Sequence, residues 1–218
     1  MKEETLQRIR DETQRLDELP REVGSFELKR SDAVDENTVE IFYYDSPKKH
    51  CAVVAHYDDA TREYKIKIRL GLIEWSLTRF FDGSFEKFFE RIRAELEPML
   101  ERFDENNFAT NSFIDKLNLN AWKYGTQLPP KINSFELFIA PSNPVEYTNG
   151  SFIIVNYVDF DRARDLAVYF NIYSDEFSAE AHDNGHIQVL YDFDAKNLNE
   201  LEEKLCAHLE NQLTEKKM

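Results

Sequence analysis

The distribution of apolar residues in this chain predicts an α+β protein of two tandem related units. Each unit is expected to be an antiparallel four- to five-stranded sheet flanked by an N-terminal and a C-terminal helix. Three observations indicate this: runs that alternate apolar and polar residues, longer runs with apolar residues every three or four positions, and segments of the first half that recur in the second. A polar joint, Asp104-Glu105-Asn106-Asn107, predicts a boundary between residues 1–105 and 106–218. The two units could also pack as one pseudo-symmetric domain.

The first half begins with a helix predicted over residues 3–19. Its apolar residues form a narrow stripe, which we expect to pack on the unit's own sheet, with a groove or a partner helix as the alternative. The stripe consists of Leu6, Ile9, Thr13, Leu16 and Leu19. Pro20 ends the helix.

Five strands and a second helix complete the first half. The predicted strands are Ser25–Lys29, Thr38–Tyr44, Cys51–Tyr57, Tyr64–Leu70 and Ile73–Phe80. The helix is predicted over Ser84–Phe103, with Ser84 as its N-cap. Pro98 lies inside this helical pattern and predicts a kink or break near Ala94–Glu97, because proline removes a backbone donor.

The second half repeats this order of elements. A short helix is predicted over Ser112–Trp122, and Asp183-Asn184-Gly185 predicts a tight hairpin turn. The predicted strands are Ser134–Ala140, Phe152–Tyr157, Leu166–Tyr173, Phe177–Ala181 and His186–Asp192. A helix over Asn197–Leu213 closes the chain, with Asn197 as its cap and Glu200 three residues later.

Recurring segments suggest an internal duplication. Ser25-Phe26-Glu27-Leu28 recurs as Ser134-Phe135-Glu136-Leu137. We further matched Ala55-His56-Tyr57 with Val155-Asn156-Tyr157 and the strand at Ile73 with that at Ile187. The last helices align over five apolar positions, and the segment 177–181 is interpreted as an additional strand of the second half.

The chain is strongly acidic, with a formal net charge of −15 that is spread over both halves. Such a surface repels nucleic acid phosphates and anionic membranes, so neither is expected as a partner, whereas a basic protein partner is favoured. The beginning of the sequence contains no apolar signal segment, and no run of residues has the length of a membrane span. With only two cysteines, Cys51 and Cys206, we expect free thiols and a cytoplasmic location.

His56, Tyr57, Asp58 and Asp59 form the candidate site, because a histidine beside two carboxylates could perform acid–base chemistry or hold a metal. The alternative is that the two aspartates only favour the turn after the strand. No cofactor is predicted, because the glycines are isolated and form no phosphate-binding loop.

Other polar clusters are better explained by structure than by chemistry. Lys65, Lys67 and Arg69 are expected on one solvated sheet face. If Asn184-Gly185 is a two-residue turn, His182 pairs with Ile187 and both histidines of the hairpin are solvent-exposed, facing apart. His50 and Cys51 are adjacent on a strand and so cannot form a dyad. Cys206 and His208 diverge on a helix, which excludes a local dyad there as well.

Three functions remain open. The first is a non-enzymatic protein-binding module, such as a chaperone, an adaptor or an inhibitor of a basic protein. The second is a hydrolase or small-ligand binder at His56–Asp59, although the lack of any catalytic motif disfavours an enzyme. The third is a structural subunit that self-associates as a homodimer through helix 3–19.

Overall fold

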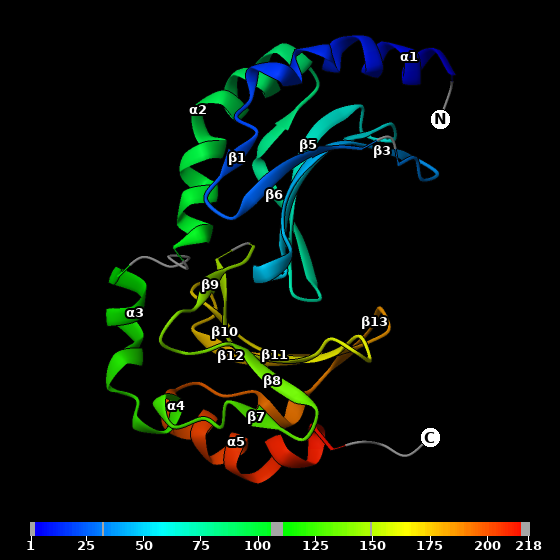
Figure 1. The fold of residues 1–218 in the computed structure, drawn as a ribbon. Coiled ribbons are helices and arrows are strands. Elements are labelled where there is room, and N and C mark those ends of the chain that lie inside the picture. The colour runs from blue at the N-terminus through cyan, green and yellow to red at the C-terminus, as the bar shows by residue number, and fades with distance from the viewer. Residues whose placement is uncertain (1–2, 32, 106–110, 149, 215–218) are drawn as a thin grey trace. The chain divides into compact units, whose positions relative to one another are not determined.

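The computed structural model describes residues 3–31, 33–105, 111–148 and 150–214. The chain divides into two compact units, Met1–Asn106 and Asn107–Met218, here called unit 1 and unit 2. Over the described residues they contain two antiparallel sheets, of six and seven strands, and five α-helices, which confirms an α+β protein (Figure 1).

Unit 1 is a sheet of sequentially connected strands between two helical segments. Its elements are α1 (Glu3–Glu12), a 3-10 helix (Thr13–Glu18), β1 (Glu22–Val23), β2 (Phe26–Arg30), β3 (Thr38–Ser46), a 3-10 turn (Pro47–Lys49), β4 (Cys51–Asp58), β5 (Glu63–Leu70), β6 (Ile73–Asp82) and α2 (Phe85–Asp104). The sheet order is β1-β2-β3-β4-β5-β6, so each strand pairs with its neighbours along the chain.

Helix α2 covers one face of this sheet, here called the core face (Figure 1). Alternation along β5 explains the choice of face, because Ile66 and Ile68 are fully buried while Lys67 and Arg69 point to the opposite, open face. The ring of Phe88 on α2 lies 5.5 Å from that of Tyr64 on β5. The core of unit 1 is therefore built between α2 and alternate residues of the strands.

The N-terminal segment packs on its own sheet, as expected. Ile9 and Leu16 of the apolar stripe are each 2% exposed. The Arg8 guanidinium lies 5.1 Å from the centre of the Tyr57 ring, and the Tyr64 hydroxyl donates a hydrogen bond to Glu12. The stripe is therefore largely covered within unit 1, although the regular α-helix ends at Glu12 and continues as a 3-10 helix.

Unit 2 contains a seven-stranded sheet. Its elements are α3 (Asn111–Leu117), a 3-10 turn (Leu119–Ala121), α4 (Lys123–Thr126), β7 (Lys131–Ile132), β8 (Phe135–Ile139), β9 (Val145–Glu146), β10 (Ser151–Asp159), β11 (Arg164–Asn171), β12 (Glu176–Asp183), β13 (His186–Val189), a 3-10 turn (Tyr191–Phe193) and α5 (Leu198–Gln212). Strands follow the order β13-β12-β11-β10-β8-β7, and β9 pairs with β10. Helix α5 covers one face, where Leu201, Leu205 and Leu209 join the core of this unit.

Several local expectations are corrected. The sheets exceed four to five strands because β1, β7 and β9 have only two residues each, too few for a periodic pattern. The Ser84 side chain makes no cap hydrogen bond, and Asp82 Oδ1 instead accepts from the Ser84 N–H at 2.9 Å. Helix α2 runs without a break through Pro98. The expected helix over Ser112–Trp122 ends its α-helical part at Leu117.

Candidate functional site

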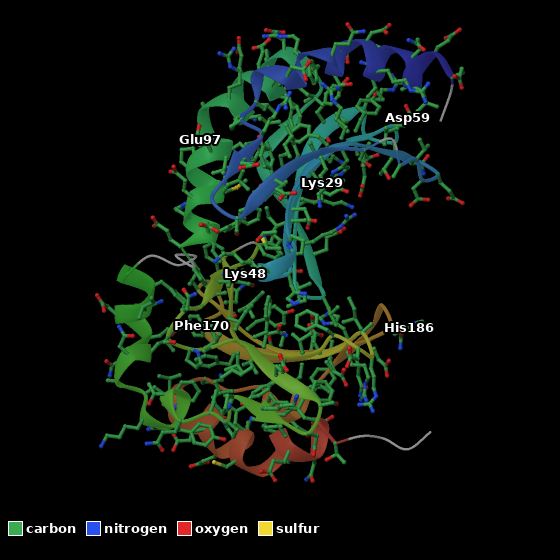
Figure 2. All side chains as sticks on the ribbon, viewed as in Figure 1. Lys29, Lys48, Asp59, Glu97, Phe170 and His186 are labelled. Atoms are coloured by element: carbon green, nitrogen blue, oxygen red, sulfur yellow. The ribbon has the colours of Figure 1, made fainter. Side chains whose placement is uncertain are left out.

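The four residues of the predicted site lie at the end of β4, but they do not form one cluster. His56 and Asp58 lie on the open face, because residues two apart on a strand share a face. Tyr57 lies between them and points to the core face, where its ring is 4.9 Å from that of Tyr64. Asp59 follows the strand at its end (Figure 2), and its N–H donates to the Asn37 carbonyl at 2.8 Å.

His56 is buried, with 7% of its surface exposed, and its Nδ1 atom has no hydrogen-bond partner in the described structure. The pKa of His56 is lowered to about 4, first by burial and then by the positive charges of Lys67 and Lys65. The imidazole is therefore neutral at pH 7. It could accept or donate a proton through Nδ1 only if another molecule reached this buried atom.

Asp58 is held by a lysine and by the turn that follows the strand. Its Oδ2 accepts from Lys65 Nζ at 2.7 Å, and its Oδ1 accepts from the N–H groups of Ala60 and Thr61 at 2.9 and 3.4 Å. The hydrogen bond from Lys65 is the main reason that the pKa of Asp58 lies below its ordinary value. Asp58 thus remains ionised at neutral pH, and these bonds suit a turn-stabilising role.

The basic row on β5 shares one face, as expected, but Lys65 is only 7% exposed, so the row is not fully solvated as predicted. Its charges are matched by carboxylates. Lys67 Nζ lies 3.8 Å from Glu40 Oε1 and 3.3 Å from Glu74 Oε1. Arg69 binds the same two carboxylates, at 2.5 Å to Glu40 and 2.8 Å to Glu74. The row is therefore part of an ion-pair network across β3, β5 and β6.

Unit 2 has a buried acid–imidazole pair that the sequence interpretation missed. Asp165 on β11 is 2% exposed, and its Oδ1 lies 2.5 Å from Nδ1 of His182 on β12. Its Oδ2 accepts from the buried Asn156 Nδ2 at 3.1 Å. The hydrogen bond with Asp165 is the main cause that raises the pKa of His182 above its ordinary value. His182 is therefore not the solvent-exposed turn residue that we expected.

The hairpin register contained the signal for this pair. Asp165 and His182 are directly opposite each other in the β11–β12 ladder, and strands joined by a short turn pair in a fixed register. The expected pairs in the next hairpin are confirmed, since His182 lies opposite Ile187 and Asp183 lies opposite His186. Placing Asp165 beside His182 also requires knowing that Asn171 pairs with Glu176, which the predicted strand ends at Tyr173 and Phe177 did not give.

The β12–β13 hairpin forms an exposed apolar edge of unit 2. All four residues of β13 are exposed, and His186 marks its turn end (Figure 2). Five large hydrophobic residues are exposed over the described part of the chain, and three of them lie within five positions here. These three are Ile187 at 65%, Val189 at 46% and Tyr191 at 76%. Exposed apolar residues gathered in this way are typical of an interaction surface.

The remaining candidates for chemistry are isolated. Burial raises the pKa of the Cys51 thiol to about 12, and Cys206 is exposed, with both thiols free. Where the structure describes the chain, no group of three or more His, Cys, Asp or Glu side chains is placed to hold a metal ion. Nor does any helix of these residues have the length and apolar content needed to cross a bilayer.

Comparisons with protein-family models, with curated proteins and with solved structures found no match to this chain.

Proposed function

We propose that this chain is a non-enzymatic protein-binding module that binds a basic protein at the β12–β13 hairpin. The observation that carries the proposal is the exposed apolar cluster of Ile187, Val189 and Tyr191 at a sheet edge. Apolar and aromatic residues of this kind act as anchors in protein interfaces. A chaperone, an adaptor and an inhibitor would all use such a surface.

The charge around the hairpin supports a basic partner. Residues 165–195 contain no lysine or arginine, whereas they contain seven acidic residues. These are Asp165, Asp175, Glu176, Glu180, Asp183, Asp192 and Asp194. Asp165 is buried against His182, and Asp175 and Glu176 pair with Lys116 and Lys196 at 3.4 and 3.5 Å. Nearer the apolar residues, Asp183, Asp192 and Asp194 are exposed, and Arg164 lies 3.5 Å from Asp183. Exposed carboxylates beside an apolar centre attract basic proteins and speed their association, and salt weakens the effect.

The contacts of His56 and Asp58 give less support to a hydrolase or small-ligand site at His56–Asp59. A general acid–base pair needs a proton that can move near neutral pH. The pKa of His56 is lowered to about 4, and Asp58 is bonded to Lys65. That alternative stays a prediction, and its best support is the unpartnered, buried Nδ1 of His56.

We also propose that the two units are tandem copies of one ancestral unit. In unit 1 the Tyr44 hydroxyl donates to the Pro20 carbonyl at 2.5 Å, and in unit 2 the Tyr157 hydroxyl donates to the Pro129 carbonyl at 2.7 Å. The tyrosines are 113 residues apart and the prolines 109. The difference of four residues lies in the connection from β8 to β10, which is longer than that from β2 to β3.

Backbone features support the same spacing of 113 residues. Arg62 and Asp175 both have left-handed conformations, with φ of 59° and 58°, as do His50 and Ala163 with 46° and 49°. Such values are uncommon for residues other than glycine, so their recurrence at one spacing favours common ancestry. A β-bulge also recurs, at Glu40/Phe42 in β3 and at Ile153/Val155 in β10.

The spacing of 113 residues changes which segments of the two halves we match, compared with the matches inferred from the sequence. Tyr157 takes the place of Tyr44, so Val155-Asn156-Tyr157 is no longer matched with Ala55-His56-Tyr57. The segment 177–181 belongs to β12, which takes the place of β5 and is therefore not an additional strand. A cytoplasmic location remains part of the proposal, supported by the two free thiols.

The test is affinity co-purification from native cytosol with bound proteins identified by mass spectrometry, at low and at high salt. A variant with Asp183→Asn and Asp192→Asn removes two exposed charges from the hairpin region. The matched control, Glu90→Gln with Glu101→Gln, removes two exposed charges from α2. We expect one stoichiometric basic partner, lost at high salt and weakened only by the hairpin variant. Equal weakening by both variants, or no bound protein at low salt, would contradict the proposal.

A further inference from the structure

The backbone of β13 presents hydrogen-bonding groups outward. Asp183 and His186 close the two-residue turn, in which Asn184 and Gly185 both have positive φ. At the other end of the strand, the Leu190 N–H donates to the Ala179 carbonyl of β12 at 2.8 Å. Directions alternate along an antiparallel strand, so residues 186, 188 and 190 face β12 and residues 187 and 189 face away from it. The N–H and C=O groups of Ile187 and Val189 therefore lie along the outer edge of the sheet.

The side chains at these same positions are apolar and exposed. Ile187 lies opposite His182 and Val189 lies opposite Glu180. Ala179 and Leu190, one residue away on each strand, belong to the core of unit 2, so Ile187 and Val189 lie on the face away from that core. Both are β-branched residues, which pack well against a neighbouring strand. A second strand laid along β13 would cover them and bond with their backbone groups at the same time.

The last strand of unit 1 shows how such an edge can be closed. Arg91 on α2 donates through Nη1 to the Arg79 carbonyl of β6 at 2.5 Å, and Arg79 pairs with Glu95 of α2 at 3.2 Å. Side chains of a helix thereby occupy part of the β6 edge. At β13, by contrast, all four residues are exposed. Proteins usually protect such edges, because an open edge pairs readily with another chain.

We propose that an extended segment of a basic protein adds to the outer edge of β13 as a further strand. This inference rests on the proposed function and specifies its mode of binding. Charge complementarity selects the occupant, because Asp183, Asp192 and Asp194 are exposed on the hairpin and on the turn that follows it. Of these three carboxylates, Asp183 lies 3.5 Å from Arg164. Main-chain hydrogen bonds to Ile187 and Val189 supply affinity, and the acidic surroundings favour lysine and arginine on the added strand.

The direct test is backbone NMR with hydrogen exchange on the whole chain, using a short capped peptide of alternating lysine and valine residues as the probe. Strand addition predicts slower exchange of the Ile187 and Val189 amides when the peptide binds, because these amides become bonded. The peptide of alternating glutamate and valine is the charge control and is expected not to bind. This measurement requires no substitution in the protein.

Two variants at one position distinguish strand addition from electrostatic attraction between the peptide and the acidic surface. Val189→Pro removes an outward N–H while the Leu190 N–H still bonds β12, and proline is tolerated at such edge positions. Val189→Thr keeps the N–H and the β-branched shape, so it is the matched control. We expect Val189→Pro to weaken peptide binding about tenfold relative to Val189→Thr. The thermal midpoint of each variant checks that the fold is retained.

The outcomes distinguish this inference from the proposed function. Equal binding by both variants, or no protection of the Ile187 and Val189 amides, would overturn strand addition, while a co-purified partner would still support a binding module. If these amides are protected without peptide and light scattering shows a dimer, a second copy of the chain occupies the edge. That result would overturn the proposal that a basic protein segment occupies it. Failure of the peptide to bind at low salt would overturn it as well.

Discussion

Two histidines, one buried and one half-buried, show how the surroundings of one side chain set its charge. His56 lies in unit 1 beside Lys65 and Lys67, and its pKa is lowered to about 4, mainly by burial. His182 lies in unit 2 against Asp165, and that hydrogen bond raises its pKa. The two imidazoles thus depart in opposite directions from the ordinary value, because one must stay neutral to remain buried and the other is stabilised when charged.

These shifts give opposite contributions to the pH dependence of stability. The unfolded chain binds a proton at His56 near pH 6.5, so the free energy of unfolding falls as pH drops from about 6.5 towards 4. The interaction of protonated His182 with Asp165 is present below pH 6.5 and is lost as pH rises through the raised pKa. Acidification therefore destabilises unit 1 through His56, whereas alkalinisation weakens the His182 contact in unit 2.

We predict that NMR titration of the imidazole signals will find His56 near pH 4 and His182 above 6.5. Asp165→Asn should lower the pKa of His182, because the amide removes the negative charge that favours the imidazolium. The control is His56 in unit 1, whose pKa of about 4 should not change in this variant. A His182 pKa that is unchanged by Asp165→Asn would contradict the pairing.

Among the secondary-structure elements, helix α5 has the clearest local signal for its start. Asn197 Oδ1 accepts from the Glu200 N–H at 3.0 Å, as the sequence predicted. Glu200 Oε2 accepts in turn from the Lys196 N–H at 2.9 Å, one residue before the cap. Helix starts leave backbone donors unsatisfied, so these two bonds fix the residue at which α5 begins.

We predict that Asn197→Ala lowers the free energy of unfolding of unit 2 by about 1 kcal/mol, because it leaves the Glu200 N–H without its acceptor. Asn197→Asp keeps an acceptor oxygen and is the matched control, with a change of at most a few tenths of a kcal/mol. Urea denaturation followed by circular dichroism measures both. Equal losses for the two variants would mean that the cap bond does not stabilise the helix.

The sequence predicts an element well where periodicity runs long enough. All ten predicted strands are present within a few residues, because alternation over five or more positions reflects one buried face. The two-residue strands β1, β7 and β9 have no such pattern. Ser84 shows another limit, since its type suits a cap but its side chain makes no cap hydrogen bond, and its own N–H donates to Asp82.

The candidate site was harder to predict, because it depends on contacts between strands. The sequence indicated that His56 and two aspartates lie near one strand end, but not that Lys65 would bind Asp58 or that His56 would be buried. It likewise could not show that the residues after Gly185 remain exposed at a sheet edge. Burial and edge positions follow from the order of strands in the sheet, which alternation alone does not specify.

Across the whole molecule, the proposed duplication implies that matching bonds have matching roles in the two units. Tyr44 and Tyr157 are both fully buried, and each donates to a proline carbonyl. Burial raises the pKa of each hydroxyl to about 12, so both remain protonated donors at neutral and moderately alkaline pH. Each bond joins the sheet to the segment that precedes its first short strand.

We predict that Tyr44→Phe and Tyr157→Phe lower the free energy of unfolding by similar amounts, about 1–2 kcal/mol each, because each leaves a carbonyl without its donor. The two tryptophans provide the measurement, since Trp75 lies in unit 1 and Trp122 in unit 2. Urea unfolding in single-tryptophan backgrounds assigns each loss to its unit. A large loss at one tyrosine and none at the other would show that the two bonds are not equivalent, and the proposed tandem relation would lose its strongest support.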